Sequence, residues 1–79
     1  MLTYSDHAQK RMLERGVTPT NCEEVVKDCL NPWQLVMKSK DLTTFRFDHN
    51  QVVVITDHTK THVITVFKGS GYWNPETDV

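Results

Sequence analysis

The chain has 79 residues, of which 38% are hydrophobic and 24% are charged. A chain of this length buries only roughly 60% of its unfolded surface on folding, so we expect a single domain over residues 1–79 with one core. The net charge is −1 and the calculated pI is 6.4. The protein as a whole therefore has no positive electrostatic field that would attract nucleic acid, and any anion-binding site must be local.

The amino-terminal residues carry no basic region followed by an apolar stretch, and no apolar run in the chain is long enough to span a membrane. We therefore expect a cytoplasmic protein without membrane contact. Residues 1–4 give only a weak signal for a short strand or an extended lead-in. Ser5 is a good N-cap and Gly16 is a natural residue to follow a helix, so a first helix is predicted over about residues 6–15.

A second helix is predicted over about residues 19–30. Thr18 is a good N-cap, Pro19 occupies the favoured first helical position, and Pro32 cannot continue a helix. One side of this helix is apolar at helical spacing and is expected to face the core. The residues on that side are Cys22, Val25, Val26, Cys29 and Leu30.

The two cysteines, Cys22 and Cys29, lie seven positions apart, which is two turns along one helix face. The rise between them is about 10 Å, which is too long for a disulfide. We interpret them as small core residues, because no further ligand is spaced suitably for zinc. No metal and no cofactor is predicted.

Four strands complete the predicted fold. The two densest β-forming runs are joined by four residues and are expected to form a central hairpin. Short links predict an antiparallel meander of strands at about residues 33–38, 43–48, 51–56 and 61–68. Residues 69–79 form a polar tail, whose Tyr72 and Trp73 either fold back onto the sheet or are loosely held. The predicted class is α+β, with both helices on one face of a four-stranded antiparallel sheet.

Polar residues on the first helix suggest a site. His7, Arg11 and either Glu14 or Arg15 share one face, because they are three or four positions apart. An imidazole can transfer protons near neutral pH, and a guanidinium can hold a phosphate by two parallel hydrogen bonds. Surface helices also carry such residues without any catalytic or binding role, and Glu14 can pair with Arg11. A phosphate site and an ordinary solvent-exposed helix face therefore both stay open.

A second polar group is predicted on the sheet. If Phe45 and Phe47 point to the core, Arg46 lies on the open face, and Thr65 lies there too if Ile64 and Val66 face the helices. The alternative is that Thr65 is only a good strand former. His49, His58 and His62 do not converge by spacing, so they are not expected to bind metal.

A family resemblance connects these residues. Three segments together resemble a family of small bacterial and phage domains of unassigned function. They are the pattern Ser5-Asp-His7-Ala-Gln-Lys-Arg11-Met-Leu-Glu-Arg15-Gly16-Val17, a helix that ends at Leu30-Asn-Pro32, and a strand Val63-Ile-Thr-Val-Phe67. That family is similar to the barnase, EndoU, colicin and RelE group of metal-independent ribonucleases. The group has two amino-terminal helices against a four-stranded antiparallel sheet, which is the fold expected here.

The resemblance implies a catalytic set made of His7, Arg11, Arg15, Arg46 and Thr65. It implies RNA as the partner and cleavage by attack of the ribose 2′-OH on the neighbouring phosphate. His7 is the candidate general base, the arginines are expected to stabilise the phosphorane, and Thr65 to hydrogen-bond a phosphate oxygen.

Two other functions stay open. The first is a non-catalytic domain on the same fold that binds a protein, such as a host factor or a cognate antitoxin, with Tyr72 and Trp73 as aromatic anchors. The second is a DNA- or RNA-binding regulator without catalysis.

Overall fold

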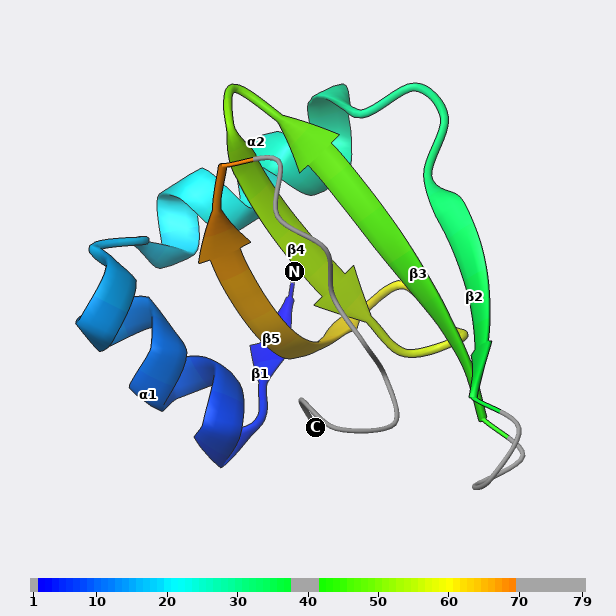
Figure 1. The fold of residues 1–79 in the computed structure, drawn as a ribbon, viewed down its shortest axis with the longest axis horizontal. Helices are drawn as coiled ribbons and strands as arrows, with labels where there is room; N and C mark the ends of the chain where they lie inside the picture. The colour runs from blue at the N-terminus through cyan, green and yellow to red at the C-terminus, as the bar shows by residue number, and fades with distance from the viewer. Residues whose placement is uncertain (1, 38–41, 70–79) are drawn as a thin grey trace.

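A computed structural model describes residues 2–37 and 42–69 of the chain. It shows two helices and a mixed sheet, which confirms the α+β class (Figure 1). The elements in chain order are β1 (Thr3–Tyr4), α1 (Asp6–Arg15), α2 (Pro19–Asp28), β2 (Trp33–Met37), β3 (Leu42–His49), β4 (Val52–Thr56) and β5 (His62–Lys68). Neither of the two helices in the described residues, α1 and α2, is long and apolar enough to cross a membrane.

The sheet has five strands in the order β1-β5-β4-β3-β2. The four later strands form the predicted antiparallel meander. The prediction of a purely antiparallel four-stranded sheet is wrong in detail, because β1 adds to the far side of β5 in parallel, with Thr3 opposite His62 and Tyr4 opposite Val63. Two residues are too few to show any periodicity, so this strand gave only a weak signal.

Helix α1 has the predicted bounds because both its ends are capped. The Ser5 side chain accepts a hydrogen bond from the Ala8 N–H (2.9 Å) and donates one to the Ile64 carbonyl oxygen (2.9 Å). Gly16 has a φ of 66°, and its N–H donates to the Met12 carbonyl oxygen. Ser5 therefore both starts the helix and ties its first turn to β5.

Helix α2 begins as predicted but ends earlier. Thr18 and Asn21 form a capping box, each side chain accepting from the other residue's N–H. The helix stops at Asp28, and the next residue, Cys29, is already extended (φ −73°, ψ 113°). Leu30, expected in the core, is instead 88% exposed.

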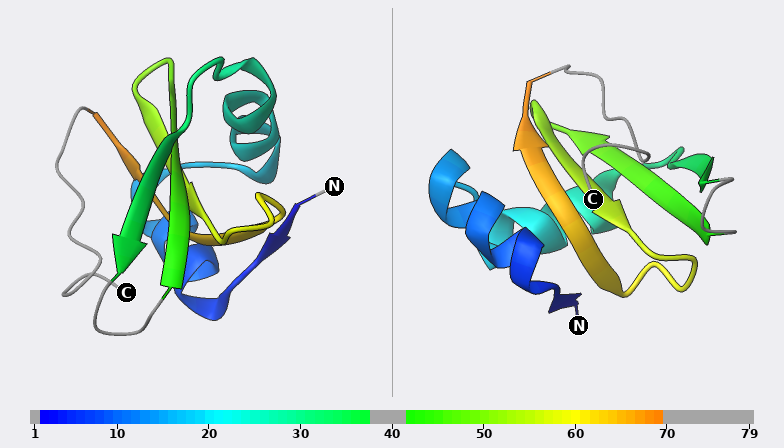
Figure 2. Two further views of the ribbon diagram at one scale, coloured as in Figure 1. Left: turned by 90° about the vertical axis from the view of Figure 1, so that its right-hand side faces the viewer. Right: turned by 60° about the horizontal axis from the view of Figure 1, so that its bottom comes forward.

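One large core lies between the sheet and the two helices, which pack on the same face of the sheet (Figure 2). Both helices contribute to it, as do β3, β4 and β5. Its buried members are Ala8, Met12, Val17, Cys22, Val25, Phe47, Val54, Val63 and Val66. Each helix therefore buries a narrow apolar stripe, as the helical spacing predicted.

A β-bulge in β5 changes which side chains face the helices. Ile55 is opposite Thr65, but the next pair is Thr56 and Val63, so Ile64 is left without a partner. Val63 therefore packs in the helix-side core, whereas Ile64 joins the opposite face. Of the two residues that the sequence analysis assumed to face the helices, Val66 does so and Ile64 does not.

Some predictions lie outside the described residues. The turn expected at residues 39–42 is described only at Leu42, where β3 begins. The tail with Tyr72 and Trp73 is likewise not described beyond Gly69.

Candidate functional site

Helix α1 runs alongside β5, and contacts at both of its ends fix this course. At the start, the Ser5 N–H donates to the Val63 carbonyl oxygen (3.0 Å). At the end, Arg15 Nη1 donates to the Val66 carbonyl oxygen (2.6 Å). The α1 flank formed by His7, Arg11 and Arg15, which are spaced by successive turns, therefore lies beside the strand that carries Thr65.

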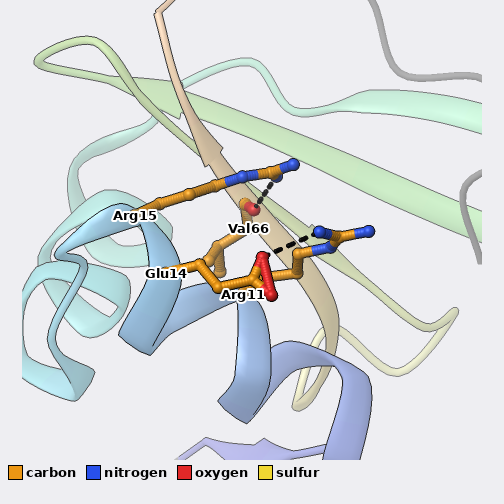
Figure 3. A network of polar contacts seen from close by, with 4 residues as sticks. All are labelled: Arg11, Glu14, Arg15 and Val66. Atoms are coloured by element: carbon orange, nitrogen blue, oxygen red, sulfur yellow. Dashed lines mark hydrogen bonds and ion pairs between the residues drawn. The ribbon is translucent and has the colours of Figure 1, made fainter.

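The two arginines of this flank are already engaged. Arg11 Nη1 forms an ion pair with Glu14 Oε2 at 2.9 Å, the alternative that the sequence left open. Arg15 holds the backbone of β5 through Val66. Figure 3 shows both side chains extending from α1 across β5. Because a guanidinium has five N–H donors, Arg15 retains donors for a further partner.

His7 is half buried on the same flank, and its Nε2 atom is fully buried. No hydrogen bond to Nε2 is formed within the described part of the chain. A buried polar atom without a partner typically costs about 1–3 kcal/mol, so native proteins rarely retain one without a functional reason. The imidazole is therefore positioned by packing, with one nitrogen left without a hydrogen-bond partner among the described residues.

Arg46 and Thr65 lie together on the face of the sheet away from the helices, as predicted. Phe45 and Phe47 pack with the helix-side core, so Arg46 between them points the other way. Arg46 is opposite Ile55 of β4, and Ile55 is opposite Thr65 of β5. The three residues form one row across three adjacent strands.

Thr65 resembles His7 in being buried and unbonded. Its side chain is 0% exposed, and no hydrogen bond to Oγ1 is formed within residues 2–37 and 42–69. Thr65 thus places a hydroxyl, able to donate or accept, in a buried position on β5. No hydrogen bond or ion pair within the described ranges joins His7 to Thr65 or to Arg46, and their convergence on one ligand remains a prediction.

Arg46 is held by two residues that the sequence interpretation missed. Its Nε donates to the Asp48 carboxylate (3.0 Å), and its guanidinium carbon lies 5.4 Å from the centre of the Phe67 ring. Asp48 follows two positions later on the same strand face, so the period of two was an available signal. The Phe67 contact crosses from β3 to β5 and had no local signal.

A cavity of about 530 Å³ lies against Arg46. Its described lining consists of Arg46, Asp48, His49, Gln51 and Gly69. This volume is within the range of small-ligand sites. The cavity places a polar, open space beside one of the predicted phosphate-binding residues.

The other histidines have separate roles. His49 Nε2 lies 3.6 Å from Asp28, and His62 Nδ1 lies 2.8 Å from the Thr3 hydroxyl. Within the described ranges, no three His, Cys, Asp or Glu side chains are grouped closely enough to hold a metal ion.

Shifted pKa values occur away from this site. Burial, with a smaller contribution from Glu23, raises the pKa of Cys22 to about 11, so its thiol is unreactive at neutral pH. Burial alone would raise the pKa of Asp57, but hydrogen bonds from the Thr59 hydroxyl and the backbone N–H groups of His62 and Thr61 outweigh it and lower the value. These groups stabilise the core and the β4–β5 turn.

Comparison with known proteins assigns no relative to this chain. No protein-family model matches it, and neither the curated proteins nor the solved structures include a match.

Proposed function

We propose that this chain is a small metal-independent ribonuclease domain that cleaves RNA by attack of a ribose 2′-OH on the adjacent phosphate. The observation that carries the proposal is the pair of buried, unbonded polar atoms, His7 Nε2 on α1 and Thr65 Oγ1 on the strand beside α1. Three arginines accompany them, Arg11 and Arg15 on α1 and Arg46 on β3. The resemblance seen in the sequence names the same five residues.

The proposed roles follow from the chemistry of each group. His7 removes the proton of the 2′-OH, and the 2′ oxygen attacks phosphorus. The bond to the 5′ oxygen breaks to leave a 2′,3′-cyclic phosphate, and the departing 5′ oxygen takes a proton from water. Arg11, Arg15 and Arg46 stabilise the negative charge of the phosphorane. Thr65 donates a hydrogen bond to a phosphate oxygen.

RNA has to displace the carboxylates that are paired with two of the arginines. Arg11 is paired with Glu14 and Arg46 with Asp48, so a phosphate has to compete with a carboxylate for each guanidinium. Both pairs are partly exposed to solvent, where an ion pair typically contributes only about 0.2–1 kcal/mol. A phosphate that contacts several arginines at once can therefore displace these carboxylates.

The test is incubation of the purified protein with mixed cellular RNA in excess chelator. We expect cyclic phosphate ends, identified by mass spectrometry, from the unmodified protein and their loss in His7→Ala and Arg46→Ala. Lys27→Ala is the matched control for Arg46→Ala, because it removes one positive charge from the exposed side of α2. Intact RNA with the unmodified protein contradicts the proposal.

A second candidate function is protein binding, which one observation favours. An apolar groove of about 460 Å³ lies between α1 and the start of α2, lined chiefly by Tyr4, Met12, Leu13 and Val17. Leu13 lines this groove and is 87% exposed, so its side chain adds to the apolar surface that a partner could contact. For this function we expect Leu13→Asp to abolish binding of the partner, whereas Leu30→Asp, at a comparably exposed leucine outside the groove, leaves it unchanged.

A further inference from the structure

A further cavity, of about 330 Å³, lies between α2 and the turn that joins β3 to β4. Its volume is at the lower end of the range of small-ligand sites. Most of its lining is polar, and the proposed function gives none of these polar residues a role. They are Asn21, Glu24, His49, Asn50, Gln51 and Lys68.

The strand register places this cavity on the helix side of the sheet. His49 is opposite Val52, and Val52 is opposite Lys68, so these three side chains lie in one row on one face. Val52 packs against the helix-side core, which fixes the side on which the row lies. The cavity is therefore at the end of the sheet, on the face opposite to that of Arg46.

The elements around this cavity hold one another in place. Asn50 and Gln51 have φ values of 50° and 63°, the positive values that a tight two-residue hairpin turn requires at both positions. The Gln51 carbonyl oxygen accepts a hydrogen bond from the Gly69 N–H (2.6 Å), which ties the turn to the end of β5. His49 Nε2 lies 3.6 Å from the Asp28 carboxylate of α2. The cavity is therefore formed before any ligand binds.

The polar groups of this cavity suit a nucleobase. Glu24 and Lys68 bring a carboxylate and an ammonium group, and neither forms an ion pair within the part of the chain that the structure describes. The side-chain oxygen of Asn21 is engaged in the capping box, so its NH2 group is the donor that remains for a ligand. His49 adds an aromatic ring. Bases of single-stranded RNA stack on such rings and form hydrogen bonds along their edges.

Two residues connect this cavity to the proposed RNA site. His49 and Gln51 line it and also line the cavity against Arg46, so the two cavities meet at the β3–β4 turn. A nucleotide that places its phosphate at Arg46 can therefore place its base on the other side of this turn.

We propose that this cavity binds the base of the RNA nucleotide whose phosphate lies at Arg46, and that it prefers bases with an exocyclic amino group. Glu24 accepts a hydrogen bond from that amino group, and Lys68 donates to a neighbouring acceptor of the base. Cytosine carries the amino group, whereas uracil carries a carbonyl oxygen at the same position and offers the carboxylate no proton there. The placement of the phosphate at Arg46 rests on the proposed function; the binding of the base does not.

The test is titration of the full chain with cytidine 3′-monophosphate and with uridine 3′-monophosphate, followed by NMR. We expect the cytidine nucleotide to bind more tightly, on the order of tenfold, which is the discrimination that one good pair of hydrogen bonds to a base provides. The largest shifts should occur at the backbone amides of His49, Asn50 and Gln51. Equal affinities for the two nucleotides, or no binding of either, overturns the inference.

Two variants assign the preference to this cavity. Glu24→Gln should remove the preference for cytidine, because the carboxylate that accepts from the amino group is gone. Glu23→Gln is the matched control and should keep it, because Glu23 is the neighbouring exposed carboxylate of α2 and does not line the cavity. A preference that survives Glu24→Gln, or that is lost equally in both variants, overturns the inference.

These outcomes separate failure of this inference from failure of the proposed function. A preference for cytidine that depends on Glu24, in a chain that leaves RNA intact, keeps the base site and rejects the ribonuclease. Cleavage of RNA by a chain that binds both nucleotides equally rejects the base site alone. Arg46→Ala should weaken the binding of both nucleotides alike, because it removes a phosphate contact and leaves the base contacts; unchanged binding rejects the placement of the phosphate.

Discussion

Arg46 of β3 and Thr65 of β5 flank the same residue, Ile55 of β4, on the face of the sheet that carries no helix. Two strand spacings separate them, roughly 10 Å between their backbones. The long side chain of Arg46 can span most of this distance, whereas the Thr65 hydroxyl is fixed close to its strand. A phosphate bound to both residues must therefore lie near β5, the strand along which α1 runs.

The first prediction concerns Thr65→Val, which removes the buried hydroxyl and keeps a branched side chain. Because Oγ1 has no partner within the described residues, we expect the free energy of unfolding to rise by about 1–3 kcal/mol. RNA cleavage should nevertheless be lost. Urea denaturation and the cleavage assay measure the two effects, and Thr43→Val, at a partly exposed position of β3, is the control. A clear loss of stability in Thr65→Val would show that the hydroxyl serves the fold.

The second prediction concerns the carboxylate that occupies Arg46. Asp48→Asn removes the negative charge that holds the guanidinium, so we expect RNA to bind more tightly and stability to change by less than about 1 kcal/mol. A salt titration of RNA binding measures the effect. Glu23→Gln makes the same change of charge on the exposed side of α2 and controls for net charge. Equal gains in both variants would contradict a specific role for Arg46.

The third prediction tests the end of α1. Gly16 has a φ of 66°, and a Cβ added there would meet only the Lys68 Nζ atom, at an ordinary 3.7 Å. Gly16→Ala should therefore cost only the conformational penalty of this backbone region, roughly 1–2 kcal/mol. Gly16→Asn should cost less, because asparagine tolerates the left-handed region better. Equal stability of all three proteins in thermal denaturation would contradict this account.

The fourth prediction concerns pH. The pKa of Asp57 is lower in the folded chain than its unfolded value of about 3.9, because hydrogen bonds to the carboxylate outweigh the effect of burial. The ionised group therefore stabilises the fold above about pH 4, and this contribution is lost as the pH falls through the folded pKa. Asp57→Asn should be less stable than the parent at pH 7, with the difference shrinking in acid. A difference that stays constant from pH 7 to acid would contradict this linkage.

Elements with local signals were predicted well from the sequence. The bounds of α1 were correct because Ser5 and Gly16 mark its ends within the helix itself. The start of α2 was correct for the same reason. Its end was predicted too late, because the sequence does not show that Cys29 already has an extended conformation. Leu30 fits the helical period and was wrongly assigned to the core.

Features set by long-range pairing could not be predicted. The face of Ile64 depends on the bulge opposite β4, and an apolar side chain at that position suits either face equally. The shared face of Arg46 and Thr65 followed from the period of two, but the donation from Arg15 to Val66 depends on where α1 lies against β5. Sequence spacing can select site residues, whereas their hydrogen-bond partners come from the tertiary arrangement.

The pairing of β1 with β5 has a consequence for synthesis of the chain. Thr3 is opposite His62, so the strand that leads into α1 finds its partner only after almost the whole described chain has been made. Helix α1 leaves the ribosome long before β5 exists to position His7. Any function of this site that needs His7 held beside β5 is therefore absent from the nascent chain until β5 has been made.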